Sequence, residues 1–352
     1  MTNMNISPST PDTAVAPGER APKVVMVLLN WNGLEDTLDC LRSISVMNYP
    51  NYDVIVIDNA SDHDPTSKIA ESFPSVEVIR MESNLGYAGG NNEGIKRGIA
   101  LGGDYFWLLN NDAIVYEDTL SLLIDEILKD SNIGLVSPVI YNDDSDKSVQ
   151  CVYGRIDWDR CEYGASLDLS EEVPNDNSVY LWGTALLISK PVVDTIGLLN
   201  EKYFAYAEDR QYCVRANEAG FSIAVVKNAA VVHKWAQATG GHGSPIKLYL
   251  AHRNNIFFWK EFLDRRRYLC FIIKNIRESL SRALRFEING LIEQAEACDN
   301  ALWNGLIGNG GGLNEIRPTP WIIKRIVTSH KYFWVTLLEG KFISWLRHKL
   351  PF

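Results

Sequence analysis

Two polar side chains that follow apolar segments are candidates for a divalent cation site. Asp112 closes the run Asn110-Asn111-Asp112 after the apolar segment Tyr105–Leu109, and His233 ends the apolar segment Ala229–Val232. One carboxylate holds Mg²⁺ or Mn²⁺ poorly, so the cation would need a second protein ligand and the oxygen atoms of a diphosphate. The neutral imidazole of His233 suits that role. The alternative is a histidine whose polar atoms are satisfied at a strand end.

A second feature with chemical potential is the pair of adjacent carboxylates Glu208-Asp209, which follows the aromatic run Tyr203–Tyr206. Carboxylates in apolar surroundings have displaced pKa values, as a general base requires. Acidic residues at the start of a helix also cap it and complement its dipole. On these residues alone, helix capping is the favoured interpretation.

Two further segments have the residue types that bind nucleotides. Asp58 ends an apolar strand, where its carboxylate can accept the N3–H of a uracil or thymine ring or can cap the polar turn that follows. The glycine-rich segment Asn84–Asn92 precedes a helical pattern, so its backbone N–H groups are suited to an anion. Its glycine spacing is not that of a dinucleotide-binding fingerprint, and a tight turn is the alternative.

The elements that position these residues alternate between strand and helix. The expected strands are 23–30, 53–58, 76–80 and 105–109, and the expected helices begin near residues 33, 67, 89 and 118. Strands of this kind with near-continuous apolar character indicate a mostly parallel sheet flanked by helices, an α/β fold. Ligands of such sheets bind at the carboxyl ends of the strands, where Asn30, Asp58 and residues 110–112 fall.

The second half of the chain has a different pattern. Residues 137–179 read as irregular, and residues 179–188 as a strand interrupted by Gly183. A helix is expected to begin near Glu208, followed by a pair of strands over 223–226 and 229–233. From about residue 246 the pattern is mainly helical. We therefore expect a flexible tail over 1–21, a catalytic domain over 22–245 and a helical region over 246–352.

Composition narrows the functional class. The chain has 352 residues and a net charge of −10, and its first part carries the acidic excess, which disfavours nucleic acid as a partner. The six cysteines include no CxxC pair, which is typical of a reducing, cytoplasmic setting. No segment has the length and apolarity of a membrane span, and the first twenty residues lack the apolar core of a signal peptide.

The C-terminal segment 318–352 combines basic residues with apolar residues at helical spacing. This pattern is typical of a helix that lies on an anionic membrane surface, which would make the protein peripheral at the inner face of the plasma membrane. A core-packing face or a homo-oligomer interface explains the same pattern. Both interpretations remain open.

Taken in order, these motifs resemble those of the family 2 glycosyltransferases, and among them the rhamnosyltransferase-like branch. The segments that carry the resemblance are 28–33 (LLNWNG), 56–62 (VIDNASD), 84–92 (NLGYAGGNN), 108–112 (LLNND), 182–185 (WGTA), 197–204 (GLLNEKYF), 206–210 (YAEDR) and 231–234 (VVHK). Each match is modest alone, and their shared order makes the resemblance specific.

The resemblance implies a GT-A fold, in which a nucleotide-binding α/β half joins an acceptor half, and it implies roles for individual residues. Asp209 matches the catalytic base, and Asp112 and His233 match the ligands of a divalent metal, Mg²⁺ or Mn²⁺. The residues expected to line the nucleotide-sugar are Asn30, Asp58, Asn84, Gly89, Asn110, Asn111, Trp182, Gly183 and Glu208. Asn110 stands where the family's metal-binding DxD motif has its first aspartate.

The implied activity is inverting transfer of a sugar, with rhamnose as one candidate, from a dTDP- or UDP-sugar. The acceptor would be a hydroxyl of a glycan or a lipid-linked molecule in cell-surface polysaccharide synthesis. Two alternatives are a nucleotidyltransferase and a non-catalytic module that binds a sugar or a partner. A nucleotidyltransferase usually has a basic loop after its first strand, whereas residues 30–33 here (NWNG) contain no Lys or Arg.

Overall fold

The structure is a computed structural model that describes residues 21–234, 243–321 and 323. Nearly all of the expected flexible tail (1–21) and most of the amphipathic segment (318–352) lie outside the described residues, so those two expectations stay predictions. Among the described residues, no helix is both long enough and apolar enough to cross a membrane.

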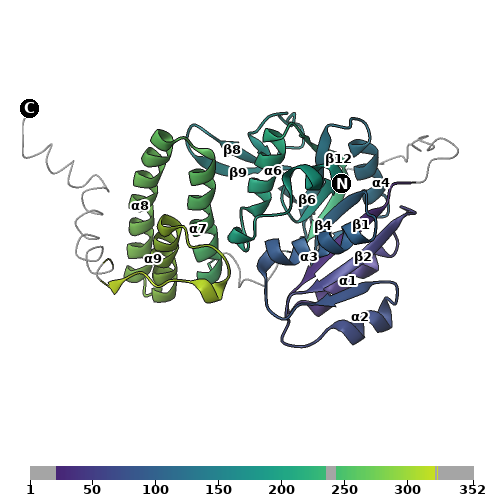
Figure 1. Ribbon diagram of the computed structural model, residues 1–352, viewed down its shortest axis with the longest axis horizontal. Helices are drawn as coiled ribbons and strands as arrows, with labels where there is room; N and C mark the ends of the chain where they lie inside the picture. Colours follow the sequence, from purple (N-terminus) through teal and green to yellow (C-terminus); the bar gives the residue numbers. More distant parts are fainter. Residues whose placement is uncertain (1–20, 235–242, 322, 324–352) are drawn as a thin grey trace, which may run out of the picture.

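A large sheet forms the centre of the protein (Figure 1). In the described residues its strand order is β3-β2-β1-β4-β11-β6-β12-β5, and β7 pairs with β6. The strands are β1 (Val24–Asn30), β2 (Tyr52–Asp58), β3 (Glu77–Arg80), β4 (Tyr105–Asn110), β5 (Ala113–Val115), β6 (Ile133–Asn142), β7 (Val149–Cys151), β11 (Ala185–Ser189) and β12 (Ser222–His233).

The expected α/β fold is confirmed, and the parallel arrangement holds for the first part of the sheet. Strands β3, β2, β1 and β4 are all parallel neighbours. Beyond β4 the sheet is mixed, because β11 runs antiparallel to both β4 and β6. The side chains of residues 24–28 in β1 are all fully buried. Helices cover both faces of this part of the sheet, which explains the near-continuous apolar sequence of β1.

The helices divide between the two faces. Those of the α/β part are α1 (Leu34–Ile44), α2 (Thr66–Ser72), α3 (Gly86–Ala100), α4 (Thr119–Ile127), α5 (Lys190–Ile196) and α6 (Glu208–Glu218), with the short 3-10 helix η1 (Glu201–Tyr203). Apolar residues of α1, α2 and α4 pack with one set of strand side chains. Those of α3, α5 and α6 pack with the alternate set, which points to the opposite face.

A small second sheet and a helical region complete the described structure. The small sheet has the order β10-β8-β9, with β8 (Tyr153–Asp157), β9 (Glu162–Ser166) and β10 (Val179–Tyr180). The helical region contains α7 (Pro245–Phe262), α8 (Arg265–Ile288), α9 (Ile292–Ile307) and the 3-10 helix η2 (Leu313–Glu315). Trp158, next to β8, stacks on Phe258 of α7 with ring centroids 6.0 Å apart, so aromatic packing joins the two units.

Two expectations for the second half of the chain were wrong. Residues 137–142 are not irregular but form the second half of β6, a largely buried central strand. Pro138 makes this strand hard to recognise in the sequence. The structure tolerates the proline because it lies beyond Val136, the last residue of β6 that pairs with β11. The expected strand pair over 223–233 is one strand, β12, with a register shift between Val226 and Ala230. The exposed polar residues at this bulge resemble a turn in sequence.

The glycine-rich segment is mostly helix rather than loop, because α3 begins at Gly86. A Cβ atom on Gly90 would lie 2.3 Å from Cδ1 of Leu29, and one on Gly94 would lie 2.2 Å from Cγ1 of Val27. These glycines therefore let α3 pack closely against β1, which explains their presence without an anion.

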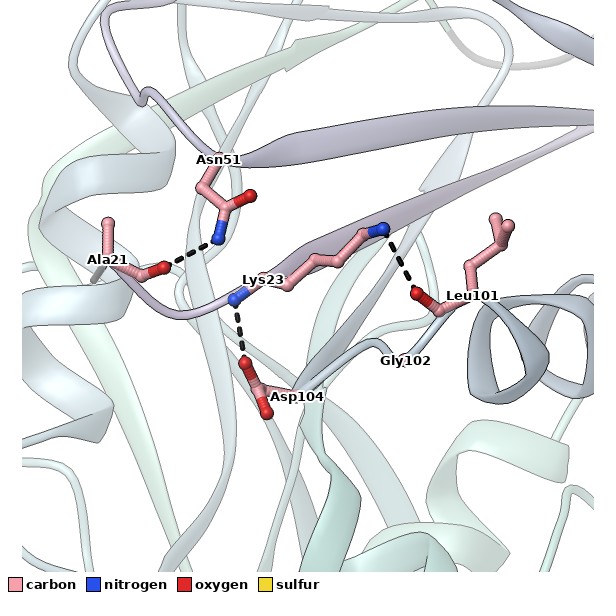
Figure 2. A pocket seen from close by; sticks show the side chains of 6 residues that line it. All are labelled: Ala21, Lys23, Asn51, Leu101, Gly102 and Asp104. Carbon is pink, nitrogen blue, oxygen red and sulfur yellow. Dashed lines mark hydrogen bonds between the residues drawn. The ribbon is translucent and has the colours of Figure 1, made fainter.

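At the amino end of β1, hydrogen bonds link the start of the strand to neighbouring segments (Figure 2). The Lys23 N–H donates to Oδ2 of Asp104 over 2.8 Å, and the Lys23 ammonium donates to the Leu101 carbonyl over 3.0 Å. A cavity of about 290 Å³ lies among these residues. It is at the opposite end of β1 from Asn30, so it does not belong to the site described next.

Candidate active site

Asp112 and His233 lie side by side at the carboxyl end of the sheet. Asp112 occupies the turn between β4 and β5, and His233 is the last residue of β12. The antiparallel pairing of β12 with β5 sets His233 opposite Ala113, so the two side chains meet. Oδ1 of Asp112 is 3.2 Å from Nε2 of His233, and both residues are buried, with exposed fractions of 4% and 8%.

Gln150 orients the imidazole of His233. Nε2 of Gln150 donates to Oδ1 of Asn142 over 2.8 Å, which turns its Oε1 toward Nδ1 of His233 at 2.9 Å. Nδ1 therefore donates to Gln150, and Nε2 faces Asp112. Such a partner on the outer nitrogen is typical of histidines that bind metals. Sequence reasoning missed Gln150, because a single glutamine in a segment expected to be irregular gives no signal.

The donor atoms of this pair fit a divalent cation. Neither carboxylate oxygen of Asp112 has a hydrogen-bond partner among the described residues. Nε2 of His233 and Oδ1 of Asp112 lie 3.2 Å apart, so either a proton on Nε2 or a divalent cation bound by both atoms would make this contact favourable. No group of three His, Cys, Asp or Glu side chains in the described residues is placed to hold a metal. A cation here would thus need oxygen ligands from a bound molecule.

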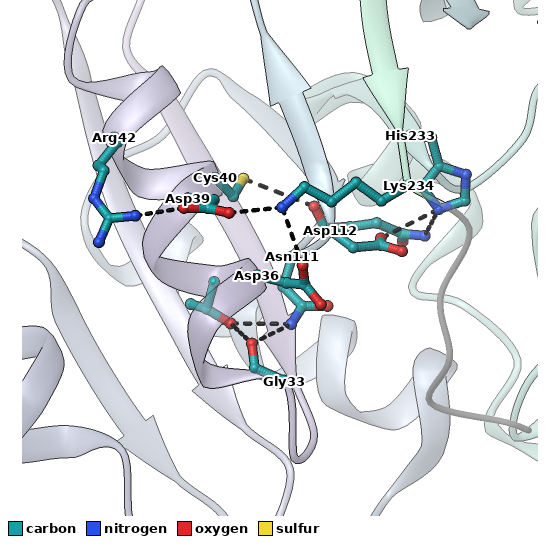
Figure 3. Close-up of polar contacts among 11 residues, drawn as sticks. Gly33, Asp36, Asp39, Cys40, Arg42, Asn111, Asp112, His233 and Lys234 are labelled. Carbon is teal, nitrogen blue, oxygen red and sulfur yellow. Dashed lines mark hydrogen bonds and ion pairs between the residues drawn. The ribbon is translucent and has the colours of Figure 1, made fainter. Parts of the chain in front are cut away.

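Lys234 links the end of β12 and the backbone of Asp112 to α1 (Figure 3). Its ammonium lies 2.7 Å from Oδ2 of Asp39 and 3.1 Å from Oδ1 of Asp36, and its backbone N–H donates to the Asp112 carbonyl over 3.1 Å. The hydrogen bond from Lys234 lowers the pKa of Asp39, which favours the ionised form of that carboxyl. Sequence reasoning did not single out Lys234. The residue holds the backbone of Asp112 and the end of β12 against α1.

Asp209 lies in the first turn of α6 and points to the segment before β11. The backbone N–H of Gly183 donates to Oδ2 of Asp209 over 3.0 Å. The Gly183 carbonyl accepts the hydroxyl of Tyr87 from α3. A Cβ atom on Gly183 would lie 2.6 Å from that hydroxyl, so the close approach requires glycine. Gly183 and Asp209 are therefore in direct contact, a pairing that the sequence did not predict.

Within the Glu208-Asp209 pair, the charge belongs on Asp209. Burial raises the pKa of both carboxyls, and the charge of Asp209 raises the pKa of Glu208 further. The N–H groups of Gly183 and Arg210 donate to Asp209 and oppose its shift, whereas Oε2 of Glu208 has no hydrogen-bond partner among the described residues. Asp209 is thus the better anion and Glu208 the better acid.

The segment that leads into Asp112 lies next to the segment that binds the carboxylate of Asp209. The backbone N–H of Asn110 donates to the Thr184 carbonyl over 2.9 Å, next to the Gly183 N–H that binds Asp209. Nδ2 of Asn110 is also 3.2 Å from Nε2 of His233. The described cavity of about 530 Å³ lies elsewhere, between β9, α7 and α8. The structure thus brings Asp112 and His233 together and places Asp209 against the neighbouring segment at Gly183, while a cavity shared by all three remains a prediction.

Asn30, Asp58 and Asn84 form hydrogen bonds within the protein. Asn30 and Asp58 have no exposed surface. Nδ2 of Asn30 donates to Oδ1 of Asp58 over 2.8 Å, and the Arg80 guanidinium lies 3.1 Å from Oδ2 of Asp58. Oδ1 of Asn84 accepts from Nδ2 of Asn59 over 2.9 Å. These side chains brace the strand ends, so the structure accounts for them without a bound nucleotide.

The other expected substrate residues differ in their surroundings. Nδ2 of Asn111 donates to Oγ1 of Thr37 over 3.0 Å, which ties Asn111 to α1. Gly89 is buried in the first turn of α3, where a Cβ atom would lie 2.7 Å from that of Leu85. Trp182 is partly exposed beside Gly183. Of these three, only Trp182 has both the exposure and the proximity to Asp209 that a sugar contact requires.

The chain is similar to known sugar-transferring proteins in sequence. Residues 24–174 match the family described as Glycosyl transferase family 2. A hexosyltransferase of low-salt glycan biosynthesis, Agl10 from Haloferax volcanii, is 25% identical over 256 residues, covering 69% of this chain and 78% of that protein. An N-acetylglucosaminyl-diphospho-decaprenol L-rhamnosyltransferase from Mycobacterium tuberculosis is 23% identical over 241 residues, covering 62% of this chain and 78% of its own length.

The fold is also similar to that of a solved glycosyltransferase. The crystal structure of GalNAc-T7 with UDP, GalNAc and Mn²⁺ aligns with a TM-score of 0.55 at 16% identity. The alignment covers 71% of this chain and 49% of GalNAc-T7, so this chain spans about half the length of that protein. The expected GT-A type fold is confirmed by this similarity.

Proposed function

Since residues 24–174 form a family 2 glycosyltransferase domain of the rhamnosyltransferase-like kind, we propose that this enzyme inverts the anomeric centre of a nucleoside diphosphate sugar as it transfers the sugar to a hydroxyl. The donor would be a dTDP- or UDP-sugar, with rhamnose as the first candidate. One observation carries the proposal. The Asp112–His233 pair at the carboxyl end of the sheet has the donor atoms for a cation, and the neighbouring segment at Gly183 binds the partly buried carboxylate of Asp209.

Asp112 and His233 would hold Mg²⁺ or Mn²⁺ together with the diphosphate of the donor. When bound, this cation stabilises the negative charge that develops on the leaving diphosphate. By accepting from Nδ1 of His233, Gln150 would leave Nε2 available to a cation, and Lys234 holds the backbone of Asp112. Asp58 would face the pyrimidine after a local rearrangement of its contact with Arg80.

Asp209 would act as the general base. It accepts the proton of the acceptor hydroxyl while that oxygen forms a bond to the anomeric carbon, and the bond from the anomeric carbon to the phosphate oxygen breaks. The nucleoside diphosphate leaves with the bonding electron pair. A single displacement at one carbon inverts its configuration. Trp182, partly exposed beside Gly183, offers an apolar face for a deoxysugar.

The acceptor and the location follow from the same proposal. We propose a glycan or lipid-linked acceptor in cell-surface polysaccharide synthesis, because one relative's name specifies a diphospho-decaprenol acceptor. A lipid-linked acceptor places the enzyme at the cytoplasmic face of the plasma membrane. The basic, apolar segment 318–352 would contact that surface or, alternatively, a second copy of the chain.

A donor screen tests the function. The purified protein is heated with dTDP-rhamnose, UDP-glucose or UDP-GlcNAc, each with MnCl₂ or with EDTA, and nucleotide release is measured in parallel. We expect one donor to raise the unfolding temperature only with metal, because binding to the native state alone stabilises it. Release of the nucleoside diphosphate on adding acceptor is expected. Formation of a new nucleotide-sugar from a nucleoside triphosphate would instead identify a nucleotidyltransferase, and binding without turnover a non-catalytic module.

The raised pKa of Asp209 predicts how the rate of transfer depends on pH. A base works only when deprotonated, and burial raises the pKa of Asp209. We therefore expect kcat/KM to fall with decreasing pH around a midpoint above about 3.9, the ordinary value of an aspartate. The measurement is the pH profile of kcat/KM for wild type and for Glu208→Gln. If Glu208 is the protonated member of the pair, this variant keeps the midpoint; a midpoint that moves by one pH unit or more would assign the charge to Glu208.

A further inference from the structure

The chain reaches Asp209 through a strained loop. Residue Phe204 has φ 63° and ψ −65°, and the Ala205 N–H donates to the Tyr203 carbonyl over 2.7 Å. These values describe a γ-turn of positive φ, which is rare. Tyr206 (φ 73°) and Ala207 (φ 69°) are also left-handed, although none of the three is glycine. Such backbone persists only where surrounding groups hold it in place.

Two buried side chains of α7 hold this loop. Nδ2 of Asn254 lies 2.7 Å from the Tyr203 carbonyl oxygen, 2.7 Å from that of Ala205 and 2.8 Å from that of Tyr206. Nη2 of Arg253 donates to the Tyr203 carbonyl over 3.0 Å. Both side chains have no exposed surface. The carbonyls of Tyr203, Ala205 and Tyr206 thus each accept a hydrogen bond from α7.

The two side chains also fix each other. Nε of Arg253 donates to Oδ1 of Asn254 over 2.9 Å, so the amide can direct only its NH₂ group at the loop. Nη1 of Arg253 donates to the Gly311 carbonyl over 2.9 Å. On its other side, the loop carbonyl of Phe204 accepts the N–H of Ala88 in α3 over 3.0 Å. The loop is therefore held between the helical region and the α/β part.

We propose that Arg253 and Asn254 are positioning residues for the reaction: they hold the backbone of residues 203–206 in the path that delivers Asp209 to the N–H of Gly183. The inference rests on the proposed role of Asp209 as base. It gives a part in the reaction to the helical region, which lies outside the matched residues 24–174. Ala207, in the left-handed conformation, is the residue from which α6 starts, so a change in the loop alters the direction in which α6 begins.

The test compares Asn254→Ala with Asn304→Ala. Asn304 of α9 is also fully buried, and its Nδ2 donates to the carbonyls of Asn300 and Arg317 over 2.7 Å each. Both variants lose buried hydrogen bonds from one asparagine, so both should unfold at a lower temperature. Only Asn254→Ala should lower kcat, by about a hundredfold, because a misplacement near 1 Å at a reacting group has roughly that effect. Its donor Kd should stay within about threefold of wild type.

An equal fall of kcat in the two asparagine variants would overturn the inference, as would a loss in Asn254→Ala that lies wholly in donor binding. Arg253→Lys decides the matter if Asn254→Ala does not fold. Lysine keeps the charge but cannot reach both the Tyr203 and Gly311 carbonyls, so kcat should fall about tenfold. A kcat equal to that of wild type would contradict the positioning role.

Amide hydrogen exchange separates this inference from the proposed function. Exchange over residues 204–210 should become faster in Asn254→Ala and stay unchanged in Asn304→Ala, whatever substrate the enzyme uses. Unchanged exchange in Asn254→Ala overturns the inference even in an active enzyme. Faster exchange in that variant, with no transfer by the wild type from any nucleotide-sugar, supports the loop contact and overturns the proposed function.

Discussion

Asp209→Asn should bind the nucleotide-sugar as well as wild type and transfer it a hundred- to ten-thousand-fold more slowly, roughly the contribution of a general base. Asparagine has nearly the same shape and can still accept the N–H of Gly183, so the fold around α6 should be kept. It cannot take a proton from the acceptor hydroxyl. The measurement is kcat by nucleotide release under saturating donor and acceptor, with the donor Kd from calorimetry.

Asp194→Asn is the matched control for this substitution, because Asp194 is an exposed aspartate on α5 whose partner is Lys190. It should leave both kcat and donor Kd unchanged, since surface ion pairs contribute little. A kcat for Asp209→Asn within about tenfold of wild type would remove Asp209 from the role of base.

Asp112→Asn should abolish the effect of metal while leaving the metal-free protein at least as stable. The wild-type carboxylate is buried with two oxygens that lack hydrogen-bond partners among the described residues, beside Nε2 of His233. Replacing it by an amide removes a buried charge and supplies an N–H donor, which should raise the free energy of unfolding by about 1 kcal/mol. Transfer should fall by at least about a hundredfold, because the leaving diphosphate loses its cation.

The measurement for this variant is the unfolding temperature with EDTA and with MnCl₂ plus donor. Wild type should gain stability with metal and donor, and Asp112→Asn should not. Asp118→Asn, an exposed aspartate before α4, is the control that should behave as wild type in both conditions. A metal-free Asp112→Asn that is clearly less stable than wild type would show that Asp112 serves the fold rather than a cation.

Much of the fold could be predicted because the central residues of β1, β2 and β4 are buried and apolar. Strand β6 could not, because Pro138 is a strand-breaking signal whose acceptance depends on where the pairing of β6 with β11 stops. The bulge in β12 could not be separated from a turn for a similar reason. Both errors concern tertiary context, which local sequence does not contain.

The site shows the same division. Asp112 and His233 could be paired from the order of the motifs, and the register of β12 against β5 confirms that they meet. Their supporting residues carry no such signal: Gln150 is a lone glutamine, and Asn254 lies in a helix where the sequence indicated no chemistry. The roles of Asn30 and Asn111 also depend on hydrogen bonds across the fold, to Asp58 and to Thr37, that spacing alone does not reveal.

A crystal structure with Mn²⁺ and the nucleotide-sugar identified by the donor screen, recorded at the manganese absorption edge, tests the central claim most directly. The account predicts one anomalous peak bonded to the Asp112 carboxylate, to Nε2 of His233 and to diphosphate oxygens, with the anomeric carbon of the sugar facing Asp209. A manganese ion bound away from Asp112 and His233, or a sugar that Asp209 cannot reach through an acceptor hydroxyl, would contradict it.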